Sequence, residues 1–599
     1  MNGERRAKNW HIFYRLLYMH LKAFSKKFII ILSALLLLVA GGYIYIRYHF
    51  LKAKNFKPDN SKAKSILDLR PAIIAKLQQV VKDGSNGLYI LSVQKLDIDV
   101  KASKLDAVNA SITVDTAAML QLEKLKKLPD DIFKMKFATL HIDGLGIEDL
   151  INKKHLSINA IYCNDPVIEV FHKNQPYNAA ERKANDSLSF YGRIKGQTKS
   201  IQIGKINIGR GSFIDHNRNK KNRVSRFNVV SIIMKDLLID SVTQYDNKRF
   251  LFTKYTAIEC NNYFFRTPDS LYFFKAGSIH VSGEKHQIIV KDVELKPRGD
   301  KQQFERKLKA RQVMYHLIFP EVTLRNINWW DMINHERFVA KDAEITHGIF
   351  YTYMDETLPP APFNRDNFPG QILMKLSVPI SVKKLTLHHY NVAFEELNGV
   401  SKKAATLFFD DVTGTASNIS NVASDIKKDR YLTINMKSLF MHKVPLTTRV
   451  IFDLAKAHTG AFTADIFMDT LRNTIVNPVA QPLGLFYFKK GEMQSGSAHL
   501  DGNDSIIKGT VALRYTDLHI DPLKKNREDT SKLKKKTFTS LFANTFLIKN
   551  SNPGKGNDFR KPVFSVNRGD NSNLFSFMWA SVLTGILKTI GVPVKAVLK

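Results

Sequence analysis

The sequence is poor in cysteine and in acidic residues, and each shortage excludes a class of protein. Only Cys163 and Cys260 occur among 599 residues, so the chain forms at most one disulfide and cannot supply a four-cysteine zinc site. The chain has 55 acidic residues and 90 Lys and Arg residues, which give a formal net charge of +35. Such an excess suits nucleic acid or an anionic membrane surface. A hydrophobic content of 44% excludes a wholly disordered chain.

Recognisable catalytic motifs are also missing. The sequence contains no G-x-x-x-x-G-K-[ST], H-E-x-x-H or G-x-S-x-G, the motifs of phosphate loops, zinc proteases and hydrolases. His388 and His389 are adjacent, so in a strand they point to opposite faces and make poor joint metal ligands. Residues 501–504 resemble the start of a calcium loop but lack its distant glutamate. We therefore expect no enzyme activity, no catalytic residue, no metal and no cofactor; a hydrolase of unrecognised type is the less favoured hypothesis.

Only one long apolar run is present. Residues 28–46 are 19 consecutive uncharged, mostly apolar positions. As a helix rising about 1.5 Å per residue they cross about 30 Å of hydrocarbon. No small-residue cleavage signature follows, which favours a membrane-spanning helix over a cleaved signal peptide. Residues 1–27 are basic, which predicts that they are cytoplasmic. We expect a single-pass protein whose bulk lies across the membrane from nucleic acid, so nucleic-acid binding is disfavoured.

Most of the remaining chain has the pattern of strands. Residues 47–87 are predicted to form a membrane-proximal helical connector, because Ile73, Leu77, Val80 and Val81 fall at helical spacing. Residues 88–523 then alternate with period two. Within them an apolar-x-apolar-x-x-apolar-x-apolar pattern recurs at steps of 49 to 64 residues, beginning at Leu91, Leu140, Ile201, Ile258, Val322, Ile380 and Ile434.

The two-residue gap inside this pattern predicts a bend in each strand. The gap turns the following side chains to the opposite face unless a bulge absorbs the extra residue. Bent strands stacked side by side give a long curved sheet with one apolar face. We predict a mainly β fold, an elongated, quasi-repeating bent β-sheet groove (88–523) with a few short helices; separate β-sandwiches stay open as the alternative. The residues expected to line the groove are Ile203, Ile206, Leu324, Ile327, Val382, Leu385 and Leu387.

Two segments complete the chain. Residues 524–573 are predicted to form a basic loop and terminal strands, and residues 574–599 an amphipathic C-terminal helix. Apolar residues at three- and four-residue intervals indicate this helix; they include Phe575, Trp579, Leu583 and Leu587. Three positions stay open for it: on a second membrane, over the open end of the sheet, or packed on the strands.

The combined pattern resembles the AsmA family of bacterial envelope proteins, which includes the TamB and YhdP-type bridge-like lipid transporters. The resemblance covers most of residues 28–591: the basic N-terminus, the single span and strands such as residues 199–216 (KSIQIGKINIGRGSFIDH). It is most specific near the C-terminus, in an Asn-Pro pair at residues 477–478, a Gly-x-x-x-x-x-Tyr-x-Asp-Leu run and a closing helix. The matching residues there are Gly509, Tyr515, Asp517, Leu518, Trp579, Gly585 and Gly591.

The resemblance implies a protein anchored in the bacterial inner membrane, with a periplasmic groove along which phospholipids move between the two membranes. This role supports outer-membrane biogenesis. The implied partners are phospholipids, the inner membrane, an unidentified envelope protein and, through the C-terminal helix, the outer membrane. Physical chemistry agrees, because an apolar groove removes acyl chains from water at about 0.8 kcal/mol per CH₂. The alternative function is a non-catalytic scaffold or assembly factor for an envelope protein machine.

Overall fold

The computed structural model describes residues 70–99, 102–146, 153–180, 191–192, 195, 198–219, 223–267, 269–335, 337–361, 365–376, 378–484, 486–525, 533–535, 548–569 and 573–592. The predicted cytoplasmic segment, the predicted span at 28–46 and the first part of the predicted connector lie outside these residues. Among the residues that are described, no helix combines the length and apolarity needed to cross a membrane.

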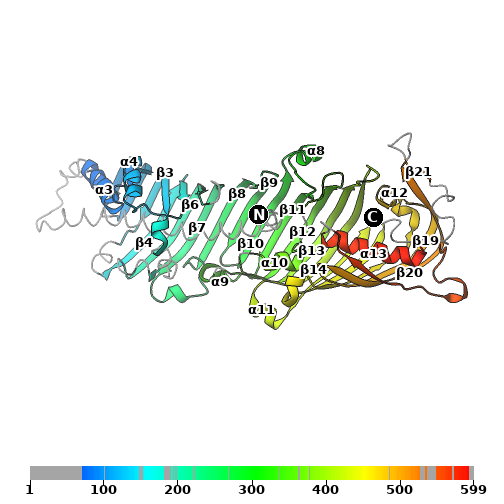
Figure 1. Ribbon diagram of the computed structural model, residues 1–599. Coiled ribbons are helices and arrows are strands. Elements are labelled where there is room, and N and C mark those ends of the chain that lie inside the picture. Colours follow the sequence, from blue (N-terminus) through cyan, green and yellow to red (C-terminus); the bar gives the residue numbers. More distant parts are fainter. Residues whose placement is uncertain are drawn as a thin grey trace, which may run out of the picture.

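Within the described residues, a single sheet of 22 strands dominates the fold. Figure 1 shows it as a long, twisted and bent ribbon. The first half comprises β1 (Tyr89–Asp99), β2 (Lys104–Val114), β3 (Asp131–Asp143), β4 (His155–Asn164), β5 (Val167–His172), β6 (Ser200–Asn217), β7 (Arg223–Ile239), β8 (Tyr255–Arg266), β9 (Tyr272–Ser282), β10 (Gln287–Pro297) and β11 (Met314–Arg325). The prediction of a mainly β chain with one long bent sheet is therefore confirmed.

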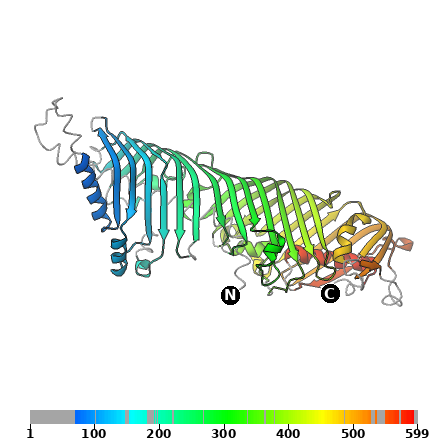
Figure 2. The same ribbon diagram turned by 90° about the horizontal axis from the view of Figure 1, so that it is seen from above.

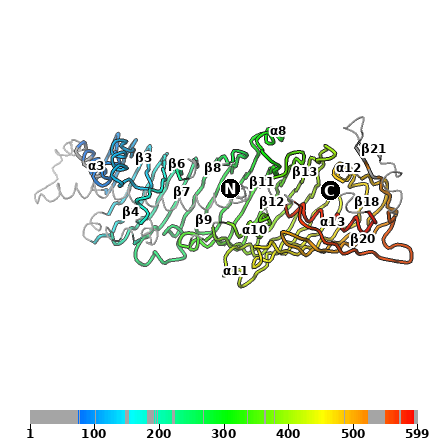
Figure 3. The backbone as a smooth tube through the Cα atoms, in the orientation of Figure 1, coloured from blue at the N-terminus to red at the C-terminus, as the bar shows by residue number. Residues whose placement is uncertain are grey.

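The second half of the sheet continues in chain order. It comprises β12 (Phe338–Asp355), β13 (Ile380–Leu397), β14 (Ala404–Ser420), β15 (Tyr431–Phe440), β16 (Val444–Asp453), β17 (Phe462–Met468), β18 (Leu471–Arg472), β19 (Phe486–Gly502), β20 (Ile506–Lys525), β21 (Leu533–Lys535) and β22 (Val563–Asn567). Strands that are neighbours along the chain are mostly neighbours in the sheet, as the steady change of colour in Figure 3 shows.

Most neighbouring strands are antiparallel, with parallel pairs at two places. β4 and β5 together flank β6 in parallel, and β12 is parallel to β13. A parallel pair needs a crossover connection. The crossover from β12 to β13, residues 356–379, carries a short helix, α10 (Pro369–Met374), and the fully buried Phe368, whose ring lies 5.9 Å from that of Phe462 in β17. This crossover therefore also packs on later strands of the sheet.

The bends follow a line of residues that crosses the sheet at one height. These residues have positive φ and are Asn109, Asp165, Arg210, Val229, Asn262, Asp292, His347, His389 and Asp411. The ladders align them: Asn262 of β8 and Asp292 of β10 both lie opposite Gly277 of β9. Asn, Asp and His tolerate this conformation better than most residues. In each strand, the residue with positive φ accommodates the extra residue of the two-residue gap in the apolar pattern. The apolar side chains before and after the gap therefore lie on the same face of the sheet.

That shared face is the core of the molecule. Ile142, Ile161, Ile206 and Met234 are successive cross-strand partners on β3, β4, β6 and β7, and each is at most 1% exposed. They belong to one continuous cluster of buried side chains that reaches from Leu77 to Val592. We call this side of the sheet the apolar face and the opposite side the outer face.

Short helices cover the ends and rims of the sheet. The larger ones are α3 (Arg70–Gly84) and α13 (Leu574–Ile590); the shorter ones, besides α10, are α4 (Thr116–Lys124), α8 (Lys301–Glu305), α9 (Trp329–Asn334), α11 (Ala423–Lys428) and α12 (Asn477–Gly484). Figure 2 shows α3, in blue, beside the first strands and α13, in red, toward the other end. α3 contacts β1, and its Gln78 donates a hydrogen bond to the Leu91 carbonyl at 3.1 Å. The edge strand β1 is thereby covered.

Candidate functional site

The seven residues predicted to line the groove all lie on the apolar side. Ile203 and Ile206 are on β6, Leu324 is on β11, Ile327 follows β11, and the other three are on β13. The ladders connect them directly: Leu324 pairs with Ala343, and Ala343 pairs with Leu385. All seven except Leu387 belong to the continuous cluster or pack against it, and Leu387 is the partner of Ile345, which does.

Their exposure divides them into two groups. Ile203 and Ile206 are 0% exposed, Ile327 and Val382 1%, and Leu324 5%. Leu385 and Leu387 are half-buried. Neighbouring strands place apolar side chains at the same height as the first five, so the protein itself covers these residues. Only Leu385 and Leu387 present apolar surface that the protein leaves partly uncovered.

Leu385 and Leu387 belong to a larger group of half-buried apolar side chains, which we call the apolar zone. Its members come from the apolar face of β12 to β17 and from α13. They are Ile345, Phe350, Leu385, Leu387, Val392, Phe394, Phe409, Ile434, Met436, Ile466, Phe575, Met578, Trp579, Val582, Leu583 and Ile586. The apolar face of β2 to β10, in contrast, is largely sealed, as Ile142, Ile232 and Ile288 show with 0 to 1% exposure. Half-buried apolar side chains that gather on one face mark a surface suited to an apolar ligand.

The C-terminal helix α13 forms one side of this zone. It packs on β20 and β22 through its small and polar side: Ser581 and Thr589 are 0% exposed and Thr584 4%. These three hydroxyls donate to the carbonyls of Phe577, Gly585 and Ala580, each at 2.8 Å, so their burial leaves no hydrogen bond unmade. Of the four helix residues singled out from the sequence, Leu587 is 2% exposed, whereas Phe575, Trp579 and Leu583 are half-buried and belong to the apolar zone.

Packing of this helix requires a glycine. A Cβ at Gly585 would lie 2.4 Å from Cγ2 of Val511 in β20 and 2.7 Å from Cε1 of Phe564 in β22. The helix therefore approaches the strands closely. Asn573 caps its first turn in a capping box with Ser576, and Gly591, at φ 80°, ends it. Residues 593–599 of the predicted helix lie outside the described part of the chain.

One carboxyl group lies at the end of the apolar face. Glu396 of β13 pairs with Met354 on one side and Ala405 on the other. Burial, and next the neighbouring Glu356 carboxylate, raise the pKa of Glu396 to about 7, and Arg311 opposes this shift. Glu396 is thus neutral below about pH 7, which suits its position beside apolar side chains.

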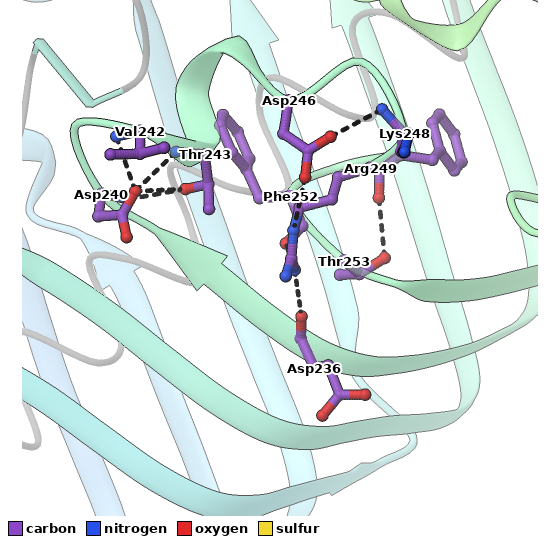
Figure 4. A network of polar contacts seen from close by, with 10 residues as sticks. Asp236, Asp240, Val242, Thr243, Asp246, Lys248, Arg249, Phe252 and Thr253 are labelled. Atoms are coloured by element: carbon purple, nitrogen blue, oxygen red, sulfur yellow. Dashed lines mark hydrogen bonds and ion pairs between the residues drawn. The ribbon is translucent and has the colours of Figure 1, made fainter.

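The outer face and the turns carry the charges. Figure 4 shows the turn between β7 and β8, where Arg249 donates to the Asp236 carbonyl at 2.7 Å and pairs with Asp246 at 3.2 Å. These contacts hold the turn that brings Phe250 onto the indole of Trp329, with ring centroids 4.3 Å apart. The polar network thus closes one rim of the apolar face and is not itself part of the apolar zone.

The two cysteines do not pair. Both are free and buried, and they lie on β4 and β8, which are separated by β6 and β7. Burial raises the pKa of each thiol to about 12, so both are unreactive at neutral pH. Within the described residues, no group of three or more His, Cys, Asp and Glu side chains is placed to hold a metal ion.

No protein-family model matches the sequence, and no curated protein matches it either.

Sequence reasoning missed the aromatic part of the zone. Phe394 follows the bend of β13 at His389, and Phe409 precedes the bend of β14 at Asp411. Neither belongs to the repeated pattern from which the groove residues were chosen. Phe394 lies two positions after Val392, and Phe409 two after Leu407, all on the apolar face. This period-two recurrence of apolar residues in β13 and β14 is the sequence signal that could have identified Phe394 and Phe409.

Proposed function

We propose that this chain is an inner-membrane-anchored periplasmic protein that carries phospholipids along its apolar face and so supports outer-membrane biogenesis. The observation that carries the proposal is the apolar zone, where two apolar surfaces, the strands around Leu387 and the helix α13, are both half-buried. The AsmA-like sequence pattern and the apolar run at 28–46 agree with it.

The mechanism requires no covalent chemistry. An acyl chain that lies against Leu385, Leu387 and Phe394 leaves water, and the transfer contributes about 0.8 kcal/mol per buried CH₂. Headgroups stay at the rim, where water and basic side chains solvate the phosphate. Apolar contacts are not directional, so a chain slides along them with little change in free energy.

Because only part of the apolar face is sealed, we assign different roles to the two halves of the sheet. Side chains such as Ile203 and Ile206, at 0% exposure, are covered by protein and form a stable framework. Those around Leu387 hold the lipid. Transport through the sealed half then requires the apolar side chains that cover one another there to move apart.

Site-specific photocrosslinking in the full chain tests this proposal. A photoreactive amino acid replaces Leu387, and the matched control replaces Thr386, which the alternation of the strand places on the outer face. Expressed in a bacterial envelope, the Leu387 variant is expected to yield covalent phospholipid adducts and the Thr386 variant none. Equal adduct yields at both positions, or none at either, would contradict a lipid-binding apolar zone.

A further inference from the structure

A cavity of about 580 Å³ lies where β14 loses one of its neighbours. On one side β14 pairs with β13 along its whole length, down to the pair of Ala404 with Leu397. On the other side its ladder with β15 stops at the pair of Phe409 with Phe440. The hairpin at residues 441–443 and a short 3-10 helix, η6 (Asn473–Val476), lie beside this free edge together with the start of α12, and the cavity remains between them.

Residues from both faces of the sheet line the cavity. Successive residues of a strand point to opposite faces. Ala405, the partner of Glu396, is on the apolar face and is 6% exposed, whereas Ala404 and Thr406 are on the outer face. All three line the cavity. The cavity therefore lies at the edge of β14, where the outer face and the apolar face meet, four residues from Phe409 of the apolar zone.

The lining combines apolar walls with a polar opening. Phe408, Met441, Ile475 and Pro478 supply the apolar surface, and Thr406 and Thr474 supply hydroxyl groups. The volume is within the range of about 300 to 1,000 Å³ that is typical of small-molecule sites.

Lys443 carries an exposed positive charge at this opening. Three charged or titratable side chains line the cavity: Glu395, His442 and Lys443. Glu395 accepts hydrogen bonds from Lys301 at 2.5 Å and from the Tyr351 hydroxyl at 2.6 Å, and His442 contacts Asp410 at 2.7 Å. Lys443 is exposed, and no ion pair between described residues includes it. Its ammonium group is available to an anion.

We propose that this cavity is a lateral entry site for a phospholipid. The phosphate binds at Lys443 beside the hydroxyls of Thr474 and Thr406. One acyl chain passes the free edge of β14 and reaches the apolar zone at Phe409, so that a lipid enters the middle of the sheet without travelling from either end. This inference rests on the proposed function, because the chain continues into the apolar zone.

The experiment measures how fast a lipid arrives at Leu387 in the full-length protein. The protein carries the photoreactive amino acid at Leu387 and is mixed in detergent with short-chain phosphatidylglycerol; adducts are counted over time. Ala404→Trp fills the cavity from an exposed position, and Lys443→Glu reverses the free charge. The matched controls are Val400→Trp, a 65% exposed position on the turn before β14, and Lys437→Glu, on the outer face of β15.

We expect Ala404→Trp to slow adduct formation and Lys443→Glu to slow it about tenfold, the effect of losing one charge-assisted hydrogen bond. Both controls keep the wild-type rate. A diacylglycerol probe, which lacks the phosphate, should be insensitive to Lys443→Glu. Thr474→Trp, a second filling variant from an exposed position of η6, should reproduce the effect of Ala404→Trp.

The outcomes separate the two proposals. Wild-type rates in both filling variants and in Lys443→Glu, with normal adducts at Leu387, would overturn the lateral entry site and leave the proposed function standing. An absence of phosphatidylglycerol adducts at Leu387 in the otherwise unchanged protein would overturn the proposed function, and the entry site with it.

Discussion

The ring of Phe575 in α13 stacks on the ring of Phe394 in β13, with centroids 3.9 Å apart and planes inclined by 7°. The same Phe575 ring meets that of Phe409 in β14 edge-on, at 6.0 Å. These contacts join the last helix to strands in the middle of the chain. They also fix the distance between the two surfaces of the apolar zone, because α13 is held on β20 and β22 by its other side.

Truncation of either stacked ring should loosen the helix. Stacked aromatic pairs contribute about 0.5 to 1.5 kcal/mol beyond the burial of their area. A double-mutant cycle with Phe575→Ala and Phe394→Ala, followed by the free energy of unfolding in denaturant, should return a coupling energy of that size. Strictly additive losses would show that the stacking contributes nothing.

Charged substitutions should distinguish the sealed part of the apolar face from the apolar zone. Ile206→Asp places a carboxylate at a fully buried position, and we expect it to prevent folding or to lower the free energy of unfolding by several kcal/mol. Leu385→Asp, at a half-buried position, should leave a folded protein with less bound lipid.

Circular dichroism and thermal unfolding of the full chain check the first effect. Ile206→Val, which removes one buried methylene, is the size control and should cost only about 0.5 to 1.5 kcal/mol. If Leu385→Asp unfolds the protein as completely as Ile206→Asp, Leu385 is a core residue and the apolar zone is smaller than described.

Substitution of Gly585 should detach α13 from the strands. The added side chain of Gly585→Val meets Val511 and Phe564, so overpacking should destabilise the contact by about 1 to 3 kcal/mol. Limited proteolysis of the helix, compared with wild type, measures this loss. Gly84→Ala at the end of α3 is the control, since a Cβ there meets nothing within 4 Å. Equal protease resistance in both variants would contradict the close packing of α13.

The stability of the protein should depend on pH through Glu396. Its pKa is raised from 4.5 to about 7 in the folded state, chiefly by burial. Between these values the folded protein holds a proton that the unfolded chain has released, so the free energy of unfolding falls as pH rises from about 4.5 to 7 and then levels off.

Glu396→Gln keeps the side chain neutral at every pH. Its stability relative to wild type should therefore increase from pH 4.5 to pH 7, as measured by the denaturation midpoint at each pH. Glu123→Gln, which changes an exposed carboxylate on α4 that pairs with Lys173, is the control for the loss of a carboxylate. Parallel curves for wild type and Glu396→Gln would rule out a titrating Glu396.

The bent sheet followed from local pattern because its cause is local. The gap between Cys260 and Tyr263 contains Asn262, whose positive φ takes up the extra residue, so the pattern alone places both flanking side chains on one face. The same reasoning placed Ile203 and Leu385 on the apolar side. A strand pattern reports which face a residue occupies, and that property depends on its immediate neighbours.

Exposure could not be predicted in this way. Ile206 and Leu385 occupy the same kind of position, yet one is sealed and the other half-buried, because residues far along the chain decide what covers each of them. Which side of α13 packs on the strands could not be predicted from the sequence either. Gly585 and Ser581 make a surface small enough for Val511 and Phe564, and the sequence does not show that β20 and β22 lie there. The cavity beside Ala404 results from strands of unequal length, which only the assembled sheet reveals.

Quantitative mass spectrometry of the lipids that remain with the purified full-length protein tests the central claim most directly. The wild type and a Leu385→Asp, Leu387→Asp variant are compared after washing in a mild detergent, with Thr386→Asp, on the outer face, as the control for added charge. We predict that wild type and Thr386→Asp retain phospholipid and that the double variant, still folded by circular dichroism, loses most of it. Equal phospholipid in all three folded proteins would contradict the claim that the apolar zone holds lipid.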